Sequence, residues 1–387
     1  MKLDKLKAIV VGITLGVAVL GFLPVADLDF RVSKEILAQF AVLTAIALLF
    51  YRNVWVRMFV LWSIVRTFLT YNGQSSVTLY TIFLYTAFYQ VIADKLNKKN
   101  IDIVLDFICA ITLLQVFWQI LQFFGIWIAI VPLNGLEGSV KINAWVTLAK
   151  PLTCTAFTGL MSNINMTAAA LAIGLPAFFR KKWNYFIPII WLGLLLAKGM
   201  AGIIPAYIVT MVYIWMKAKV SLRTKVLIII ASLSVGAIYL TTFDKFQDLL
   251  TGSGRFPVWG EICRYIIPRK PVIGWGLGSF KSVFPAAQKA FGSEWGFVRW
   301  VQAHNEYLQV LTEQGAIGLA FIIGFIISLF RKGIKHRKES VMFIALIGVI
   351  VGTCNAGGNF LFHTTTGILF LTYAAILEKG ACDERRI

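Results

Sequence analysis

The sequence predicts an all-α protein that crosses a membrane about twelve times. Of its 387 residues, 58% are hydrophobic and only 14% are charged, with a mean hydropathy of +0.77. Soluble domains carry about 25% charged residues. The formal charge of +19 is spread over short clusters between long apolar runs, whereas nucleic-acid binding needs one basic face. We therefore expect a polytopic membrane protein that contacts membrane lipid and has no nucleic-acid partner.

The individual spans follow from apolar runs of the length a helix needs to cross the hydrocarbon core, about 20 residues. The first run follows Met1–Lys7 and looks like a signal peptide, but it lacks a small-residue cleavage site, so we expect it to be retained as a span. The fifth run is long enough either to tilt or to break near Gly125. The expected spans lie near residues 8–25, 35–51, 54–70, 76–93, 101–131, 158–179, 183–197, 200–216, 225–241, 307–330, 341–355 and 360–377.

The orientation follows from lysine and arginine, which favour the cytoplasmic side of a membrane. With both termini in the cytoplasm, 23 of these residues lie on the cytoplasmic side and five in the short outer loops. Residues 1–387 then form a single membrane domain with one long outer loop, 242–306, which carries eight basic and five acidic residues. A loop of this length is uncommon unless it is functional, and we expect short helices in it.

Several ionisable residues lie near the outer ends of the spans. Arg66 and His363 occupy such positions in spans three and twelve, and Lys198 lies in the outer turn between spans seven and eight. Each alone is explained by a side chain that reaches back to the interface. Because ionisable residues within spans mark function, their shared side indicates a functional site at the outer face.

Two motifs stand out in the long loop. The run T-G-S-G-R-F-P-V-W, residues 251–259, predicts a flexible turn that enters a short helix. Arg255 at its start suits phosphate oxygens, and Trp259, four residues on, suits a sugar or an isoprenoid chain; an interfacial Arg and Trp is the alternative. The run P-V-I-G-W-G-L-G-S-F, residues 271–280, lacks a surrounding strand–helix–strand unit, so it predicts a tight turn with close backbone approach rather than a dinucleotide site.

A third motif, H-N-E-Y-L followed by G-A-I-G, opens span ten. His304 shares a helix face with Leu308, Leu311 and Gly315, which would place its imidazole at the outer mouth of the bundle. A histidine that only caps the helix by hydrogen bonding is the alternative.

Weaker features are more simply explained by structure. Span five carries a polar stripe of Gln115, Gln119 and Gln122, for which hydrogen bonds between helices are favoured over sugar contact. Asp27 and Asp29 form a short acidic pair for which metal binding is the less favoured interpretation. The scattered cysteines predict buried thiols, with a Cys154–Cys263 pair as the alternative.

Together the three motifs resemble the O-antigen ligase and polymerase superfamily of bacteria, over residues 155–330. The run S-N-I-N-M-T, residues 162–167, is similar to the asparagine-containing start of a middle span in that superfamily. The resemblance implies a GT-C-like fold in the bacterial inner membrane with a periplasmic active site. It also implies transfer of a glycan from undecaprenyl diphosphate to an acceptor hydroxyl, without nucleotide sugar, cofactor or metal.

The resemblance also implies roles for individual residues. Arg255 matches the loop arginine that binds the diphosphate, and His304 matches the essential histidine. Members often carry an arginine where this chain has Met200, so Lys198 would supply that charge as a point cation rather than a fork. The residues expected to bind substrate are Lys198, Trp259, Arg264, Arg66, Asn165 and Asn305.

The favoured function is an O-antigen ligase, which joins the glycan to the lipid A core. A polymerase, which joins repeat units to the growing glycan, uses the same donor and is the first alternative. Glycosylation of a protein hydroxyl is a further one. The alternative from another class is a transporter of lipid-linked sugar, which is disfavoured because the long loop and the charges lie at the outer face rather than at the centre of the membrane.

Overall fold

The computed structural model describes most of the chain after residue 52. Asp27, Asp29, Cys154, His363 and the first two expected spans lie outside the described residues. The described ranges are 53–70, 73–128, 140–141, 146–148, 157–161, 163–217, 221–242, 251–252, 254–292, 300–358 and 364–383.

Helices dominate this part of the chain, as the sequence predicts. Before the long loop they are α3 (Val54–Leu69), α4 (Gly73–Lys95), α5 (Lys98–Phe123), α6 (Ile164–Gly174), η1 (Leu175–Phe179), η2 (Asn184–Phe186), α7 (Ile187–Ala197), α8 (Met200–Lys217) and α9 (Leu222–Thr242). Within and after it they are α11 (Arg255–Glu261), η3 (Ile262–Ile266), η4 (Ile267–Arg269), α12 (Phe280–Phe291), α13 (Glu306–Lys335), α14 (Ser340–Ala356) and α15 (Thr364–Asp383).

A small antiparallel sheet follows α5. The helix ends at Phe123, and Gly125 takes a left-handed φ of 82°, which supports the expected break at this position. The sheet has the order β1–β3–β2, with Ile126 paired to Leu148 and Val140 paired to the same residue from the other side. Its strands are β1 (Ile126–Ile128), β2 (Val140–Lys141) and β3 (Val146–Leu148).

Most expected spans within the described residues coincide with helices. There are two differences: the fifth span, expected over 101–131, ends as a helix at Phe123 and continues into β1, and α6 begins at Ile164 rather than near 158 because Asn163 caps it. Three helical segments there are long and apolar enough to cross a membrane: Gln74–Lys95, Asn100–Phe123 and Glu306–Lys335. Several others are apolar but shorter. The described part is therefore that of a membrane protein, while the total of twelve spans stays a prediction.

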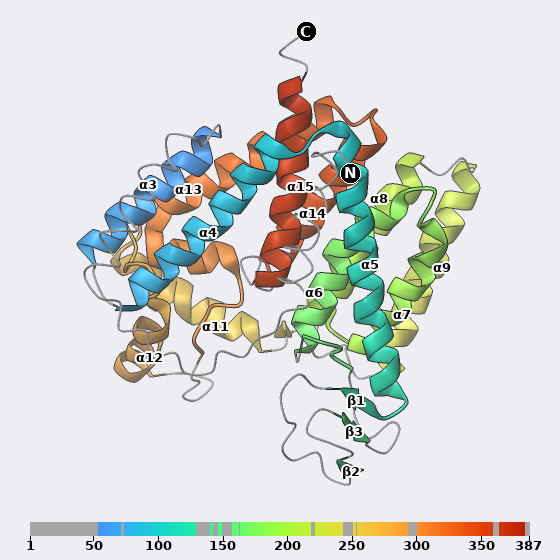
Figure 1. The fold of residues 1–387 in the computed structure, drawn as a ribbon. Coiled ribbons are helices and arrows are strands. Elements are labelled where there is room, and N and C mark those ends of the chain that lie inside the picture. Colours follow the sequence, from blue (N-terminus) through green and yellow to red (C-terminus); the bar gives the residue numbers. More distant parts are fainter. Residues whose placement is uncertain are drawn as a thin grey trace.

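The helices pack in three groups (Figure 1). Helices α3, α4 and α13 lie on one side, α5, α7, α8 and α9 lie on the other, and α14 and α15 lie between them. Helix α6 packs against α8 through small residues: a side chain at Gly202 would come within 2.1 Å of the Ala168 backbone. Close packing through small residues is typical of helices in membranes.

Opposite ends of the bundle carry different structures. The sheet lies at one end together with α11 and α12, which belong to the expected outer loop, and α15 ends at the other (Figure 1). Near that second end a buried carboxylate, Glu378, accepts hydrogen bonds from Lys332 at 2.6 Å, Tyr89 at 3.0 Å and Asn53 at 3.1 Å. This network ties together α15, α13, α4 and the start of α3, and its several donors satisfy a charge that would be costly to bury alone.

Candidate functional site

Arg255 is the first residue of α11, the short helix that the sequence predicts here. Gly254 precedes it with a left-handed φ of 79°, which turns the chain into the helix. The Arg255 Nη1 donates a hydrogen bond to the carbonyl of Gly358, just beyond the end of α14. Burial lowers the pKa of the guanidinium from its ordinary value. A fixed cation therefore lies where α11 meets the end of α14, and helix C-termini favour positive charge.

His304 lies close to this cation, just before α13. Its ring packs edge-on against Trp300 at a centroid distance of 4.8 Å. Burial, and then the positive charge of Arg255, lower the pKa of His304 to about 4. The imidazole is therefore neutral at physiological pH and can accept a proton or a hydrogen bond.

The backbone around His304 is held from both sides. The peptide groups of Ala303 are bound by side chains: its N–H donates to Gln309 Oε1 at 2.7 Å, and its carbonyl accepts from Trp259 Nε1 at 2.8 Å. Asn305 caps α13 by accepting from the Leu308 N–H at 3.1 Å, and its Nδ2 donates to the Gly357 carbonyl at 3.1 Å. The polar atoms of Trp259 and Asn305, both expected to bind substrate, thus support the loop that carries His304.

The glycine-rich segment 271–280 forms the expected tight turn and fits into a break in α13. At Gly315 the helix is interrupted by φ 70° and ψ −171°. A side chain there would lie 2.2 Å from the Val272 carbonyl oxygen, and one at Gly274 would lie 2.5 Å from the Glu313 backbone. Four backbone hydrogen bonds join the two segments: Trp275 to Thr312, Gly276 to Glu313, Ala316 to Pro271 and Ile317 to Val272.

Arg66 of α3 belongs to the same unit. It is 2% exposed, and its Nη2 donates to the Gly274 carbonyl at 3.0 Å. The side chain is therefore buried within the protein. The alternative interpretation, a side chain that reaches back to the membrane interface, does not hold for Arg66. The hydrogen bond to Gly274 gives Arg66 a structural role, in which it holds the glycine-rich turn.

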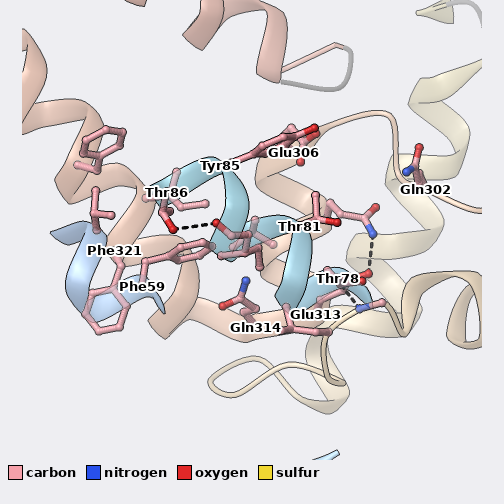
Figure 2. Close-up of a pocket in the computed structure, with 18 of the residues that line it drawn as sticks. Phe59, Thr78, Thr81, Tyr85, Thr86, Gln302, Glu306, Glu313, Gln314 and Phe321 are labelled. Atoms are coloured by element: carbon pink, nitrogen blue, oxygen red, sulfur yellow. Dashed lines mark hydrogen bonds between the residues drawn. The ribbon is translucent and has the colours of Figure 1, made fainter. Parts of the chain in front are cut away.

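Glu313 is a member of this unit that the sequence did not reveal. Its buried carboxylate accepts from the Gly278 N–H at 2.9 Å and from Gln309 Nε2 at 2.6 Å (Figure 2). It also accepts from the Phe280 N–H at 3.4 Å. The only signal in the sequence is a carboxylate in the apolar pattern of span ten, two residues before Gly315.

The remaining expected site residues lie elsewhere in the fold. Lys198 ends α7 in a left-handed conformation, and Gly199 beside it packs against the backbone of Ile164 in the first turn of α6, the turn that holds Asn165. Arg264 is exposed on η3, with its guanidinium 5.9 Å from the ring centroid of Tyr265. Within the described ranges, no group of three metal-ligating side chains is placed to hold a metal ion.

The glutamine stripe of α5 makes one contact between helices, from Gln119 to Gly193 of α7, and its other contacts are with the turn at 157–159. Gln115 donates to the Thr158 carbonyl at 2.9 Å, and Gln119 donates to carbonyls of Phe157 and Gly193 at 2.9 and 3.0 Å. Gln122 exchanges two hydrogen bonds with the backbone of Gly159 at 2.8 and 2.9 Å. The stripe therefore fixes the turn that leads into α6.

A cavity of about 340 Å³ borders the segment that carries His304. Helices α3, α4 and α13 line most of it, with Phe59 and Phe321 at one side and Gln302, which lies just before α13, at the other (Figure 2). Its walls are mainly apolar, which suits a hydrocarbon chain more than a free sugar.

Apolar helices with a half-buried arginine near a neutral histidine at one end define a membrane protein with a polar site close to its surface. A family model described as O-antigen ligase matches residues 151–323, a range that contains Arg255, His304 and the glycine-rich turn. This match supports the resemblance to the O-antigen ligase superfamily over these residues. No curated protein matches the chain.

Proposed function

We propose that the protein is an O-antigen ligase of the bacterial inner membrane. In this proposal it transfers a glycan from undecaprenyl diphosphate to a hydroxyl of the lipid A core at the periplasmic face. The observation that carries the proposal is the half-buried Arg255 near His304, whose lowered pKa keeps it neutral, within a segment that matches the ligase family. Both termini lie in the cytoplasm in this arrangement.

The proposed reaction is an inverting displacement. The acceptor oxygen attacks the anomeric carbon from the side opposite the diphosphate, and the bond between that carbon and the diphosphate oxygen breaks. His304 takes or orients the hydroxyl proton, since a neutral imidazole can act as a general base. Arg255 stabilises the negative charge that develops on the departing undecaprenyl diphosphate, and fixed cations do this well in a site of low dielectric.

The geometry around Arg255 supports diphosphate binding. A guanidinium has five N–H donors in a rigid fork, and the contact with Gly358 uses one nitrogen. The other N–H groups can pair with phosphate oxygens, for which arginine is well suited. We propose no metal and no cofactor in this scheme.

The apolar cavity supports a substrate that carries a lipid. Its volume of about 340 Å³ corresponds to roughly a dozen methylene groups, by the space that one such group fills in a close-packed interior. The cavity borders the first turn of α13, so a chain bound there would keep its polar head near His304.

A polymerase of the same superfamily is the second candidate, since it uses the same donor and the same two residues. The two functions differ in the acceptor and can be separated in a deletion strain complemented with wild type, Arg255→Ala or His304→Ala. With a ligase, both variants leave long glycan chains on the outward-facing carrier. With a polymerase, they leave single repeats on the lipid A core. Glycan that stays on the cytoplasmic side of the membrane would show a transporter and refute the proposal.

A further inference from the structure

Gln309 and Glu313 are polar side chains of α13 that the reaction above does not use. We propose that they are positioning residues, which hold the backbone next to His304 so that its imidazole stays beside Arg255. The proposal deepens the proposed function and rests on it, because it names what orders the same site. It starts from three contacts: Ala303 N–H to Gln309 Oε1, Gln309 Nε2 to Glu313, and Glu313 to the turn 271–280.

His304 needs such support because its backbone is strained. It has a φ of 51°, in the left-handed region that costs an ordinary L-residue roughly 1–2 kcal/mol. Strained conformations persist only where the surroundings fix them. Here Asn305 is fixed as the cap of α13, and both peptide groups of Ala303 are bound, one of them by Gln309.

Glu313 decides which way the Gln309 amide points. A carboxylate only accepts hydrogen bonds, so the Gln309 atom that faces Glu313 must be its NH₂ group. The amide oxygen is then the atom that faces the Ala303 N–H. Without the carboxylate the amide could turn over, and an NH₂ group would face the N–H that it now binds.

Glu313 is itself immobilised. It is 6% exposed and accepts from three donors, two of which are the backbone N–H groups of Gly278 and Phe280. The turn that supplies these N–H groups is joined to the break at Gly315 by backbone hydrogen bonds. The backbone next to His304 is thus connected through Gln309 and Glu313 to the turn 271–280 of the long loop.

The test exchanges the two side chains. In Glu313→Gln, a single amide oxygen faces the three donors that now share two carboxylate oxygens, so the three hydrogen bonds cannot all be kept. In Gln309→Glu, two carboxylates face each other. The double variant Gln309→Glu with Glu313→Gln restores the connection between the two side chains, because a carboxylate at position 309 accepts from Ala303 and from the amide at position 313. The amide oxygen at 313 keeps the shorter backbone contact, with the Gly278 N–H, and gives up the longer one with Phe280. Glu261→Gln is the matched control. Glu261 also accepts a hydrogen bond from a glutamine, Gln288, at 3.0 Å, but this pair lies within the long loop and not on α13.

Two readouts are measured on the full-length protein in detergent or nanodiscs. The first is the titration of His304 by NMR, assigned with His304→Ala among the three histidines of the chain. We expect wild type and Glu261→Gln to titrate near 4, both single variants to move toward the ordinary value of about 6.5, and the double variant to return. The second is glycan transfer, in which kcat falls roughly 10- to 100-fold in the single variants with KM for the donor unchanged.

The outcomes separate the two proposals. Single variants that titrate and transfer like wild type overturn the positioning role, and so does a double variant that recovers neither property. If wild type transfers no glycan but the titrations follow the expected pattern, the positioning role stands and the proposed ligase function fails.

Discussion

Replacement of Arg255 by lysine tests how the site binds phosphate. Arginine can hold the Gly358 carbonyl with one nitrogen and present further N–H groups to a diphosphate, whereas lysine has one nitrogen for both tasks. We expect Arg255→Lys to lose one charge-assisted hydrogen bond to the donor, worth about 1.5–3 kcal/mol. At about 1.4 kcal/mol for each factor of ten, transfer falls roughly 10- to 150-fold. Arg255→Ala removes the charge as well, and we expect a loss of roughly 10²–10³-fold or more.

The assay is kcat/KM for glycan transfer from a purified undecaprenyl-diphosphate donor by protein in nanodiscs. Arg269→Lys is the matched control, because Arg269 belongs to the same loop, is exposed and lies 4.1 Å from the ring centroid of Phe291. We expect it to keep wild-type activity. Wild-type activity in Arg255→Lys, with an equal amount of folded protein, would refute bidentate phosphate binding by Arg255.

Three further predictions concern pH, packing and metal. Because the pKa of His304 is lowered to about 4, its imidazole stays neutral down to about that pH. We therefore expect kcat/KM to be flat from about pH 8 to about pH 5 and to fall at lower pH. A fall centred near pH 6.5, the ordinary pKa of histidine, would contradict this. Gly315→Ala should lower the free energy of unfolding by about 1–3 kcal/mol or more in thermal unfolding, because its side chain would meet the Val272 oxygen. Gly260→Ala, with open space around it, is the control, and equal stability of the two variants would sink the packing argument. The pair Asp27→Asn and Asp29→Asn should transfer glycan at the wild-type rate with a chelator present, and a need for divalent metal would overturn the metal-free scheme.

The sequence predicted the helices well because apolar runs alone determine where a chain can cross a membrane. It also predicted the break near Gly125 and the close approach of the glycine-rich turn, since glycine readily adopts the left-handed backbone that both features require. The small sheet after α5 was not expected, because its strands are only two or three residues long and pair across a loop.

The site was predicted only in part. Arg255 and His304 were found from motifs, and the structure places them together. Gln309 and Glu313 were missed because each resembles an ordinary polar residue at a helix start. Their contacts arise only when Gly315 breaks α13 and the turn 271–280 fits against it. Such long-range contacts leave no local pattern.

The measurement that tests the account most directly is glycan transfer with purified components. Wild type, Arg255→Ala and His304→Ala are each supplied with an undecaprenyl-diphosphate-linked glycan and lipid A core. The account predicts that wild type joins the glycan to the core and releases undecaprenyl diphosphate, while both variants, folded and present in equal amount, do neither. Transfer by His304→Ala at the wild-type rate, or no transfer by wild type to any hydroxyl acceptor, would contradict it.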